Sequence, residues 1–488
     1  MGSMIALLDK KGGDATEPAF TMLNNLSLKK ADAYGLASPS AIRTEESLAE
    51  LERIKLNSNI IIGHALSRIL PRDKEQPLQI GNASLVFEGR IFPTPRRERD
   101  VELFARQVLD RRAENAKKFI RETEGDFVFA IVEPEKLTAG RDLLGARPLY
   151  YGENALWAGL SSERKALWAV GIKEVSSFPP GTVAEVSEKG FKFKVAEKIT
   201  CPSPRYATMK DASRRLQNLL RKSVNKRTAG LKEVAVAFSG GLDSSIIALL
   251  AKKSGVAVQL VHVSLANQSE TNHAKTFADE LKLPIHSCIY TENDVLETLP
   301  SVLRLIEEAD PVKTSIGIPF HWTAERAAEM NLKVILAGQG ADELFGGYRK
   351  YVDDYIHKGR DKAQQTIFQD VVNMYQNNLE RDFKICNFNG LELRLPFTTR
   401  ENVNFALSLP LELKLQPNEN TLRKLVLRTV GRNLGLPQSV VDRPKKAMQY
   451  ATGVSKVLDR TAKNRNLSTK EYLNSVYQTV FPRMTEYD

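Results

Sequence analysis

A short segment rich in glycine and serine constrains the fold of this chain more than any other feature. It reads Ser239-Gly240-Gly241-Leu242-Asp243-Ser244-Ser245, and it separates an apolar run at 234–238 from a helical pattern of apolar residues at 244–253. Glycines let a backbone close tightly around an anion, and the N–H groups at the start of a helix point toward that anion. The segment therefore predicts a phosphate-binding loop between a strand and a helix of an α/β domain, with hydroxyl hydrogen bonds from its serines to phosphate oxygens.

One carboxylate in this segment indicates which phosphate chemistry to expect. Asp243 would repel a bare phosphate, but it is reasonable there if it holds Mg2+ that bridges to pyrophosphate. A turn followed by a helix cap would explain the small residues of the segment, though not the aspartate. The Lys-Ser/Thr ending of Walker loops and the Gly-x-Gly-x-x-Gly pattern are both absent here. Transfer of a γ-phosphate and dinucleotide binding are therefore disfavoured.

The apolar pattern around the loop predicts a parallel sheet. Strands at 256–265 and 333–336 alternate with a helix at 270–281, and such alternation is typical of a parallel sheet covered by helices. Residues beyond Phe345 are predicted to be helical.

The amino-terminal part has a different, β-rich pattern. Its predicted strands and one helix lie at 60–62, 84–87, 101–109 (the helix), 127–132 and 183–186. A chain of 488 residues exceeds one ordinary core, and two prolines mark the segment 200–205. We therefore expect two domains, at 1–200 and 206–488.

Three further motifs give the chain a family resemblance over nearly its whole length. Residues 336–348 read Leu-Ala-Gly-Gln-Gly-Ala-Asp-Glu-Leu-Phe-Gly-Gly-Tyr, residues 390–397 read Gly-Leu-Glu-Leu-Arg-Leu-Pro-Phe, and residues 443–446 read Arg-Pro-Lys-Lys. The phosphate loop resembles that of the N-type ATP pyrophosphatases, and with these motifs the chain resembles the asparagine synthetase class, which has β-lactam-synthetase-like relatives.

The resemblance implies a reaction and a set of site residues. A carboxylate, most simply aspartate, attacks the α-phosphorus of ATP, and ammonia or an amine then attacks the acyl-adenylate. Mg2+ is held by Asp243 and Asp342, and Lys445 neutralises charge that grows in the transition state, beside Gln339 and Arg443. The implied ATP contacts are Phe238, Ser239, Gly240, Gly241, Asp243, Ser244, Ser245, Val263, Ala337 and Gly338.

The first half resembles the glutaminase half of that family, an αββα sandwich with an N-terminal nucleophile. The motifs that carry this resemblance lie at 63–68, 76–78, 87–92, 125–130 and 141–151, with Asp100. They imply a vestigial glutamine site at Arg68, Glu88, Gly89 and Asp100.

Two departures predict that this half is inactive. Gly2 stands where the family has its nucleophilic Cys, and Ser3 would serve only if Gly2 were also removed. Glu88 replaces an Asn whose amide stabilises an oxyanion, and a carboxylate opposes that task. We expect no glutamate to be released from glutamine, while ammonium is still used.

The second half also departs from the family pattern, which leaves the acceptor open. Gln339 stands where the family has Glu, and Asn389 where many members have His. Asparagine synthesis is one prediction; ring closure or amidation of another acid is a second. Modification of RNA is a third and rests only on the net charge of +11. A catalytically silent binding protein is the fourth alternative.

Composition restricts the cellular compartment and the kinds of partner to be expected. Three widely spaced cysteines, Cys201, Cys288 and Cys386, argue against a disulfide framework and a zinc site, and they suit a reducing cytoplasm. No apolar run approaches the roughly 18 residues of a membrane span, and residues 1–8 are too short and too weakly charged for a signal peptide. We expect small-molecule substrates, no membrane partner and no nucleic acid in the main prediction; a homodimer stays open.

Overall fold

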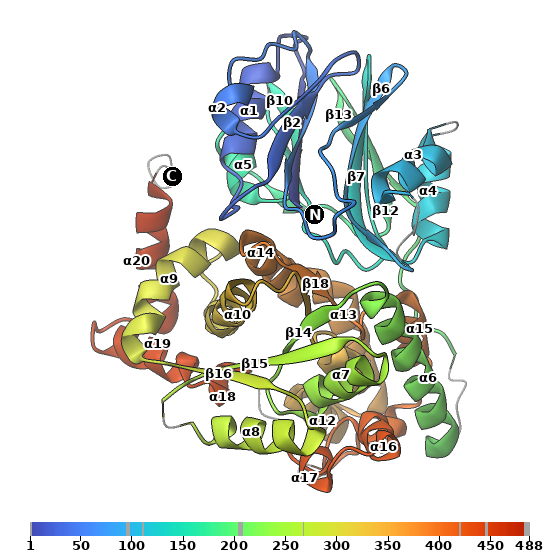
Figure 1. Cartoon of the computed structure of the whole chain (residues 1–488), viewed down its shortest axis with the longest axis vertical. Coiled ribbons are helices and arrows are strands. Elements are labelled where there is room, and N and C mark those ends of the chain that lie inside the picture. Colours follow the sequence, from blue (N-terminus) through green and yellow to red (C-terminus); the bar gives the residue numbers. More distant parts are fainter. Residues whose placement is uncertain are drawn as a thin grey trace. The chain divides into compact units, whose positions relative to one another are not determined.

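The computed structural model describes residues 2–93, 98–109, 112–203, 208–266, 268–418, 421–444 and 448–482 (Figure 1). The chain forms two compact units. The first comprises Met1–Ile199 with Asn387–Glu392, and the second comprises Thr200–Cys386 with Leu393–Asp488. The short piece at 387–392, which the sequence pattern assigned to the second half, thus belongs to the first unit. Within the described residues, no helix combines the length and the apolar character that a membrane crossing needs.

The first unit contains two antiparallel sheets. One has the order β11 (Ser176–Ser177), β9 (Tyr150–Glu153), β10 (Trp157–Ser161), β1 (Gly2–Asp9), β4 (Ile60–Leu66), β2 (Ala33–Ala37) and β3 (Ile42–Glu45). The other has the order β13 (Gly190–Val195), β12 (Thr182–Ser187), β8 (Lys136–Arg141), β7 (Gly125–Glu133), β6 (Ala83–Ile91) and β5 (Leu78–Ile80).

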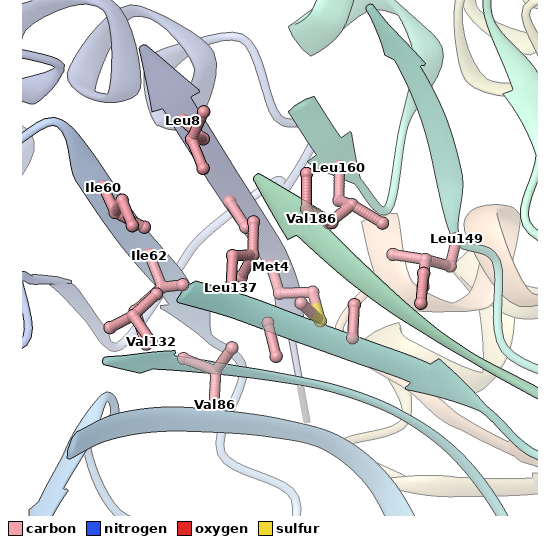
Figure 2. Packing of buried hydrophobic residues seen from close by; sticks show 14 of the residues in the cluster. Met4, Leu8, Ile60, Ile62, Val86, Val132, Leu137, Leu149, Leu160 and Val186 are labelled. Carbon is pink, nitrogen blue, oxygen red and sulfur yellow. The ribbon is translucent and has the colours of Figure 1, made fainter. Parts of the chain in front are cut away.

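Helices cover the outer faces of both sheets, which confirms the αββα sandwich. The helices are α1 (Thr16–Asn24), α2 (Leu48–Leu51), α3 (Asp100–Val108), α4 (Arg112–Glu122) and α5 (Arg164–Trp168). Aliphatic side chains from the two sheets meet between them, among them Met4, Ile62, Val86 and Leu160 (Figure 2). A second core joins α3 and α4 to one sheet through a group of phenylalanines, and a third joins α1 and α5 to the other.

Strand β1 was missing from the prediction, and burial explains the omission. All eight of its residues are buried, and it pairs with β4 on one side and β10 on the other. A strand covered on both faces is apolar throughout, so it lacks the alternation that marks a half-exposed strand. The strands predicted at 60–62 and 84–87 likewise extend further, to Leu66 and Ile91, because their whole length is buried.

The second unit is built on a five-stranded sheet, which confirms the predicted parallel architecture. Its order is β16 (Ile285–Tyr290), β15 (Ala257–Leu265), β14 (Glu233–Ala237), β17 (Val334–Leu336) and β18 (Glu392–Arg394), and the pairings of β14 with β15 and β17, and of β15 with β16, are parallel. Helices α7 (Leu242–Lys253), α8 (Ser269–Leu281) and α10 (Pro311–Glu329) pack against β15.

The remaining elements are helical, and beyond Phe345 the prediction of helices is confirmed apart from strand β18. They are α6 (Met209–Thr228), α9 (Glu292–Ile306), α11 (Ala341–Phe345), α12 (Arg349–Lys358), α13 (Arg360–Met374), the π-helical turn η1 (Tyr375–Leu379), α14 (Glu380–Phe388), α15 (Arg400–Leu407), η2 (Leu411–Leu413), α16 (Leu425–Leu434), α17 (Gln438–Val441), α18 (Met448–Ala451), α19 (Val454–Lys463) and α20 (Thr469–Val480). Capping side chains begin several of them: Asp310 caps α10 ahead of Pro311, and Ser468 and Glu471 form a capping box on α20.

Candidate active site

A cavity of about 350 Å³ lies in the second unit, and its walls include residues at the carboxyl ends of β14, β15 and β17. Ligands of parallel α/β sheets bind at this edge, because the loops that leave the strands meet there. The volume falls in the range of small-molecule sites.

The phosphate loop forms one wall of this cavity. It leaves β14 at Phe238 and enters α7 at Leu242, with Gly241 as the residue before the helix. Gly240 has φ +68° and packs on the backbone of Ala274, where a Cβ would lie 3.1 Å from that residue's Cα. The glycine is therefore required both by its conformation and by the close approach.

Hydroxyl groups hold the loop in its closed shape. The Ser239 and Ser244 hydroxyls lie 3.2 Å apart, and the Gly241 N–H donates to Ser239 Oγ at 3.2 Å. His262 on β15 lies 2.9 Å from the Phe238 carbonyl through Nδ1, and its burial lowers its pKa. A neutral imidazole thus supports the point where β14 ends and the loop begins.

Two carboxylates from different elements meet at one lysine. Lys424 Nζ lies 2.5 Å from Asp243 Oδ2 and 2.8 Å from Asp342 Oδ1, and its side chain is 2% exposed. Burial lowers the pKa of the ammonium, but the two carboxylates outweigh that effect and the net shift is upward. Lys424 is therefore a fixed positive charge in the cavity wall.

The backbone at Lys424 is also unusual. Its φ is +61°, in the left-handed region that non-glycine residues seldom occupy, and it immediately precedes α16. Such a conformation carries strain of about 1 kcal/mol or more and persists only when the surroundings impose it. The ion pairs with both carboxylates and a hydrogen bond from the Arg428 N–H to the Lys424 carbonyl at 2.9 Å contribute to holding this residue in place.

The carboxylate pair fits the Mg2+ ligands that the sequence predicted. Asp243 and Asp342 both line the cavity and both reach a single cationic nitrogen. Within the described ranges, no group of three His, Cys, Asp or Glu side chains converges on a metal position. Two carboxylates are a sufficient protein contribution for Mg2+, which binds one or two carboxylates and completes its shell with water and substrate phosphates.

The wall next to the carboxylates is polar and closely hydrogen-bonded. Glu343 Oε1 accepts hydrogen bonds from Tyr348 Oη at 2.5 Å and from Asn378 Nδ2 at 2.6 Å. Burial, reinforced by Asp342, raises the pKa of Glu343. Gln339 and Arg381 continue this wall.

Most of the predicted second-unit residues come together in this one cavity. Its lining includes Phe238, Ser239, Gly241, Asp243, Ser244, Val263, Gly338, Gln339, Asp342 and Arg443. Gly240, Ser245 and Ala337 are not among the described lining residues, and Ser245 is fully buried within α7. Lys445 lies outside the described residues.

Arg443 is anchored to a neighbouring helix. Its guanidinium pairs with Glu270 and lies 2.6 Å from His273 Nδ1, both on α8, and it sits above the Phe277 ring at 5.7 Å. These contacts hold Arg443 in the cavity wall, which Pro444 also lines.

Several cavity residues escaped the sequence prediction. They are His262, Glu270, Glu343, Tyr348, Asn378, Arg381, Lys424 and Arg428. Lys424 immediately precedes α16 in a left-handed conformation, so helical spacing gives no signal for it.

One of the four predicted glutamine-site residues in the first unit, Asp100, takes part in a buried network of ion pairs. Arg90 is buried and forms ion pairs with three carboxylates: Asp73 at 2.9 Å, Asp100 at 2.9 Å and Glu392 at 2.7 Å. The carboxylate of Asp100 thus already has a guanidinium partner. Arg68 lies further out, where it bonds to Glu75 at 2.8 Å.

The other two predicted glutamine-site residues lie on the same strand, β6. Gly89 has φ +141°, and a Cβ there would lie 2.1 Å from the Asp126 carbonyl oxygen. Glu88 is buried; it accepts a hydrogen bond from Ser162 Oγ at 2.8 Å and lies 3.9 Å from Arg147. Burial raises the pKa of Glu88 to about 7, against the influence of these partners.

Position 2 has no room for a side chain. A Cβ on Gly2 would lie 1.8 Å from the Ala65 carbonyl oxygen, and real Cβ contacts essentially never fall below 3.0 Å. The next residue, Ser3, is fully buried, and its Oγ accepts a hydrogen bond from Asn387 at 2.9 Å.

Family models match both halves of the chain. Residues 215–360 and 353–483 match the family described as Asparagine synthase, and residues 64–169 match the Glutamine amidotransferase domain. A Methanocaldococcus jannaschii protein provisionally named asparagine synthetase (glutamine-hydrolyzing) 1 is 32% identical over an alignment of 532 positions that covers 96% of this chain and 97% of that protein. Asparagine synthetase (glutamine-hydrolyzing) 3 of Arabidopsis thaliana is 26% identical, over 76% of this chain and 66% of its own length.

Similarity to solved structures is weaker. One described as the allosteric regulatory enzyme of purine biosynthesis covers 59% of this chain and 80% of its own, at 14% identity and a TM-score of 0.36.

An amidotransferase-like sandwich joined to a parallel α/β unit with a phosphate loop defines an ATP-using carbon–nitrogen ligase that acts on small molecules. The chain belongs to the asparagine synthetase family.

Proposed function

We propose that this chain adenylates aspartate with ATP and joins ammonia from solution to the activated carbonyl, which gives asparagine, AMP and pyrophosphate. The observation that carries the proposal is the single cavity that gathers the phosphate loop, two carboxylates and the buried Lys424. These are the groups needed to hold ATP while its bond to pyrophosphate breaks.

Each part of the cavity has a proposed task. The Ser239 and Ser244 hydroxyls and the N–H groups at the start of α7 orient the departing pyrophosphate. Asp243 and Asp342 would hold Mg2+, which when bound supplies Lewis-acid stabilisation of that leaving group. Lys424 keeps a positive charge beside the same position at every stage, without reorganisation. Lys445 stays a proposed catalytic residue, as the family motif implies.

Three features of the first unit support ammonia rather than glutamine as the nitrogen source. Gly2 leaves no space for a nucleophilic side chain. Arg90 already pairs with Asp100. Glu88 is a carboxylate at a position where an oxyanion would need a hydrogen-bond donor.

The decisive experiment is a pyrophosphate-release screen on the full chain with ATP, Mg2+ and a panel of carboxylic acids. Aspartate with ammonium should release pyrophosphate and form asparagine in equal amounts. Glutamine in place of ammonium should yield no glutamate. Asp243→Asn should abolish release while the protein stays folded, and Asp279→Asn, an exposed carboxylate on α8, is the matched control. Full release from Asp243→Asn would remove the assignment.

Another carboxylic acid is the second candidate acceptor. Gln339, which stands where the family carries Glu, is the observation that favours it. In that case the same screen would give pyrophosphate with a different acid. If the acid carries its own amine, release would need no added ammonium, and the product would be a ring.

A further inference from the structure

Gln339 holds a fixed orientation at the cavity wall. Its Nε2 donates a hydrogen bond to Asp382 Oδ2 at 2.8 Å. A carboxylate only accepts hydrogen bonds and an amide nitrogen only donates, so the reversed amide would set two acceptors against each other. Because Asp382 can only accept a hydrogen bond, the nitrogen end of the Gln339 amide faces it.

Asp382 is itself immobilised. It is completely buried, and Arg381 donates to its two oxygens through Nε at 2.7 Å and Nη2 at 3.1 Å. Both members of this ion pair follow η1 directly, on α14. Asp382 is not among the described cavity-lining residues, whereas Gln339 and Arg381 are.

The other polar atom of this amide, Gln339 Oε1, is then available to a ligand in the cavity. Among the described residues it has no hydrogen-bond partner, and it is not one of the buried unsatisfied atoms. Its place along the chain is also specific. The preceding residue, Gly338, packs on the phosphate loop, where a Cβ would lie 3.1 Å from Asp243 Cβ. Gln339 therefore follows a residue that packs on the phosphate loop, where the proposed function forms the acyl-adenylate.

We propose that Gln339 Oε1 accepts an N–H hydrogen bond from the attacking amine, and that Asp382 is the positioning residue that turns this oxygen toward the cavity. The inference rests on the proposed function and adds how the nucleophile is held. In the step, the amine lone pair attacks the acyl carbon, the C–N bond forms and the C–O bond to AMP breaks with its electron pair. The surplus N–H proton passes to a solvent base, because a carboxamide oxygen does not take it.

The test separates adenylation from amine transfer. Aspartate-dependent exchange of labelled pyrophosphate into ATP measures the first step, and amide formation with ammonium, or hydroxamate formation with hydroxylamine, measures the second. Gln339→Leu should lower kcat/KM for ammonium about tenfold more than it lowers exchange, the effect of losing one neutral hydrogen bond in the transfer step alone. Equal losses in both assays would overturn the proposal.

A reciprocal pair of variants tests Asp382 itself. Gln339→Glu should lower transfer, since two carboxylates would then face each other. The double variant Gln339→Glu with Asp382→Asn restores one donor and one acceptor and keeps a single negative charge beside Arg381. It should recover transfer to within about threefold of the parent. A merely structural role for Asp382 predicts no such recovery, and its absence in a folded double variant would overturn the positioning role.

Two controls keep the outcomes distinct. Gln339 is only partly buried, so its single variants decide the question even if the Asp382 change fails to fold. Absence of exchange with aspartate in the unmodified chain would refute the proposed function and this inference with it. Normal exchange with unchanged transfer in Gln339→Leu would refute this inference alone.

Discussion

The pairing of Lys424 with two carboxylates makes the substitution Lys424→Met the sharpest test of the site. Methionine keeps the length and packing of the side chain but removes the charge that Asp243 and Asp342 share at 2.5 and 2.8 Å. Breaking a buried ion pair destabilises a protein by about 3–5 kcal/mol, mainly because the partner charges stay behind. The carboxylates here are 21% and 20% exposed, so the lower end, about 3 kcal/mol, is expected.

The loss should appear as a change in melting temperature that Mg2+ reverses. For a unit of this size, 3 kcal/mol lowers the melting temperature by roughly 6 °C or somewhat more. Without nucleotide, Lys424 neutralises the two carboxylates in the parent, so Mg2+ should bind the variant more tightly than the parent; at a hundredfold excess over the variant's dissociation constant the metal returns about 2.7 kcal/mol. Even with Mg2+, pyrophosphate release should stay about 10²–10³-fold below that of the parent, because a preorganised charge has been removed.

Lys414 provides a matched control of opposite sign. Burial lowers the pKa of this lysine from its ordinary 10.5 to about 8, and no described carboxylate forms an ion pair with it. Because the folded pKa lies below the unfolded one, the charged form is disfavoured in the fold, and the penalty fades as pH rises from 8 to 10.5. Lys414→Met should therefore stabilise the protein at pH 7, by an amount of order 1–3 kcal/mol.

The measurement is differential scanning fluorimetry at pH 7 with and without Mg2+, alongside pyrophosphate release. If Lys424→Met melted within about 1 °C of the parent in both conditions, the lysine would not be what holds the two carboxylates together.

Three further substitutions test other parts of the molecule. Glu88→Gln should raise stability at pH 8, by up to about 3 kcal/mol, and leave it unchanged at pH 4. The reason is that the pKa of Glu88 is raised from 4.5 to about 7, so the stability of the protonated form is lost as pH rises through 7; a difference independent of pH in melting curves would contradict this. Gly2→Cys should destabilise the protein and give no glutamate from glutamine, since its Cβ would strike the Ala65 carbonyl; glutamate release in a coupled assay would show that the strand can adjust. Lys445→Ala should lower kcat for pyrophosphate release at least about tenfold with little change in KM for ATP; a rise in KM alone would make it a binding residue.

The parts of the site that the sequence predicted are those encoded by consecutive residues. The loop at 239–245 and the string that contains Asp342 each combine glycines, a strand end and a carboxylate within a few positions. Local chemistry of that kind is readable without knowing the tertiary fold. The parallel sheet was predictable for the same reason, because alternating apolar segments specify it.

The parts that were missed depend on contacts between distant segments. Lys424 is 181 positions from Asp243. Its left-handed backbone conformation cannot be predicted from the residue type or from the neighbouring sequence. Asp382 reaches Gln339 across 43 positions. Arg90 and Glu392 are separated by 302 positions, so their ion pair could not be predicted from either motif alone.

The first unit cannot be excised from this chain by a single cut. A fragment that ended at Ile199 would lose the piece Asn387–Glu392, and with it one carboxylate of Arg90 and the amide that bonds to Ser3. Recombination at the boundary between the halves would likewise combine an Arg90 from one parent with a 387–392 segment from another. The amidotransferase-like half is therefore not a portable module. It includes six residues encoded nearly two hundred codons downstream of its main segment, and residues 387–392 are expected to change together with residues 1–199 during evolution.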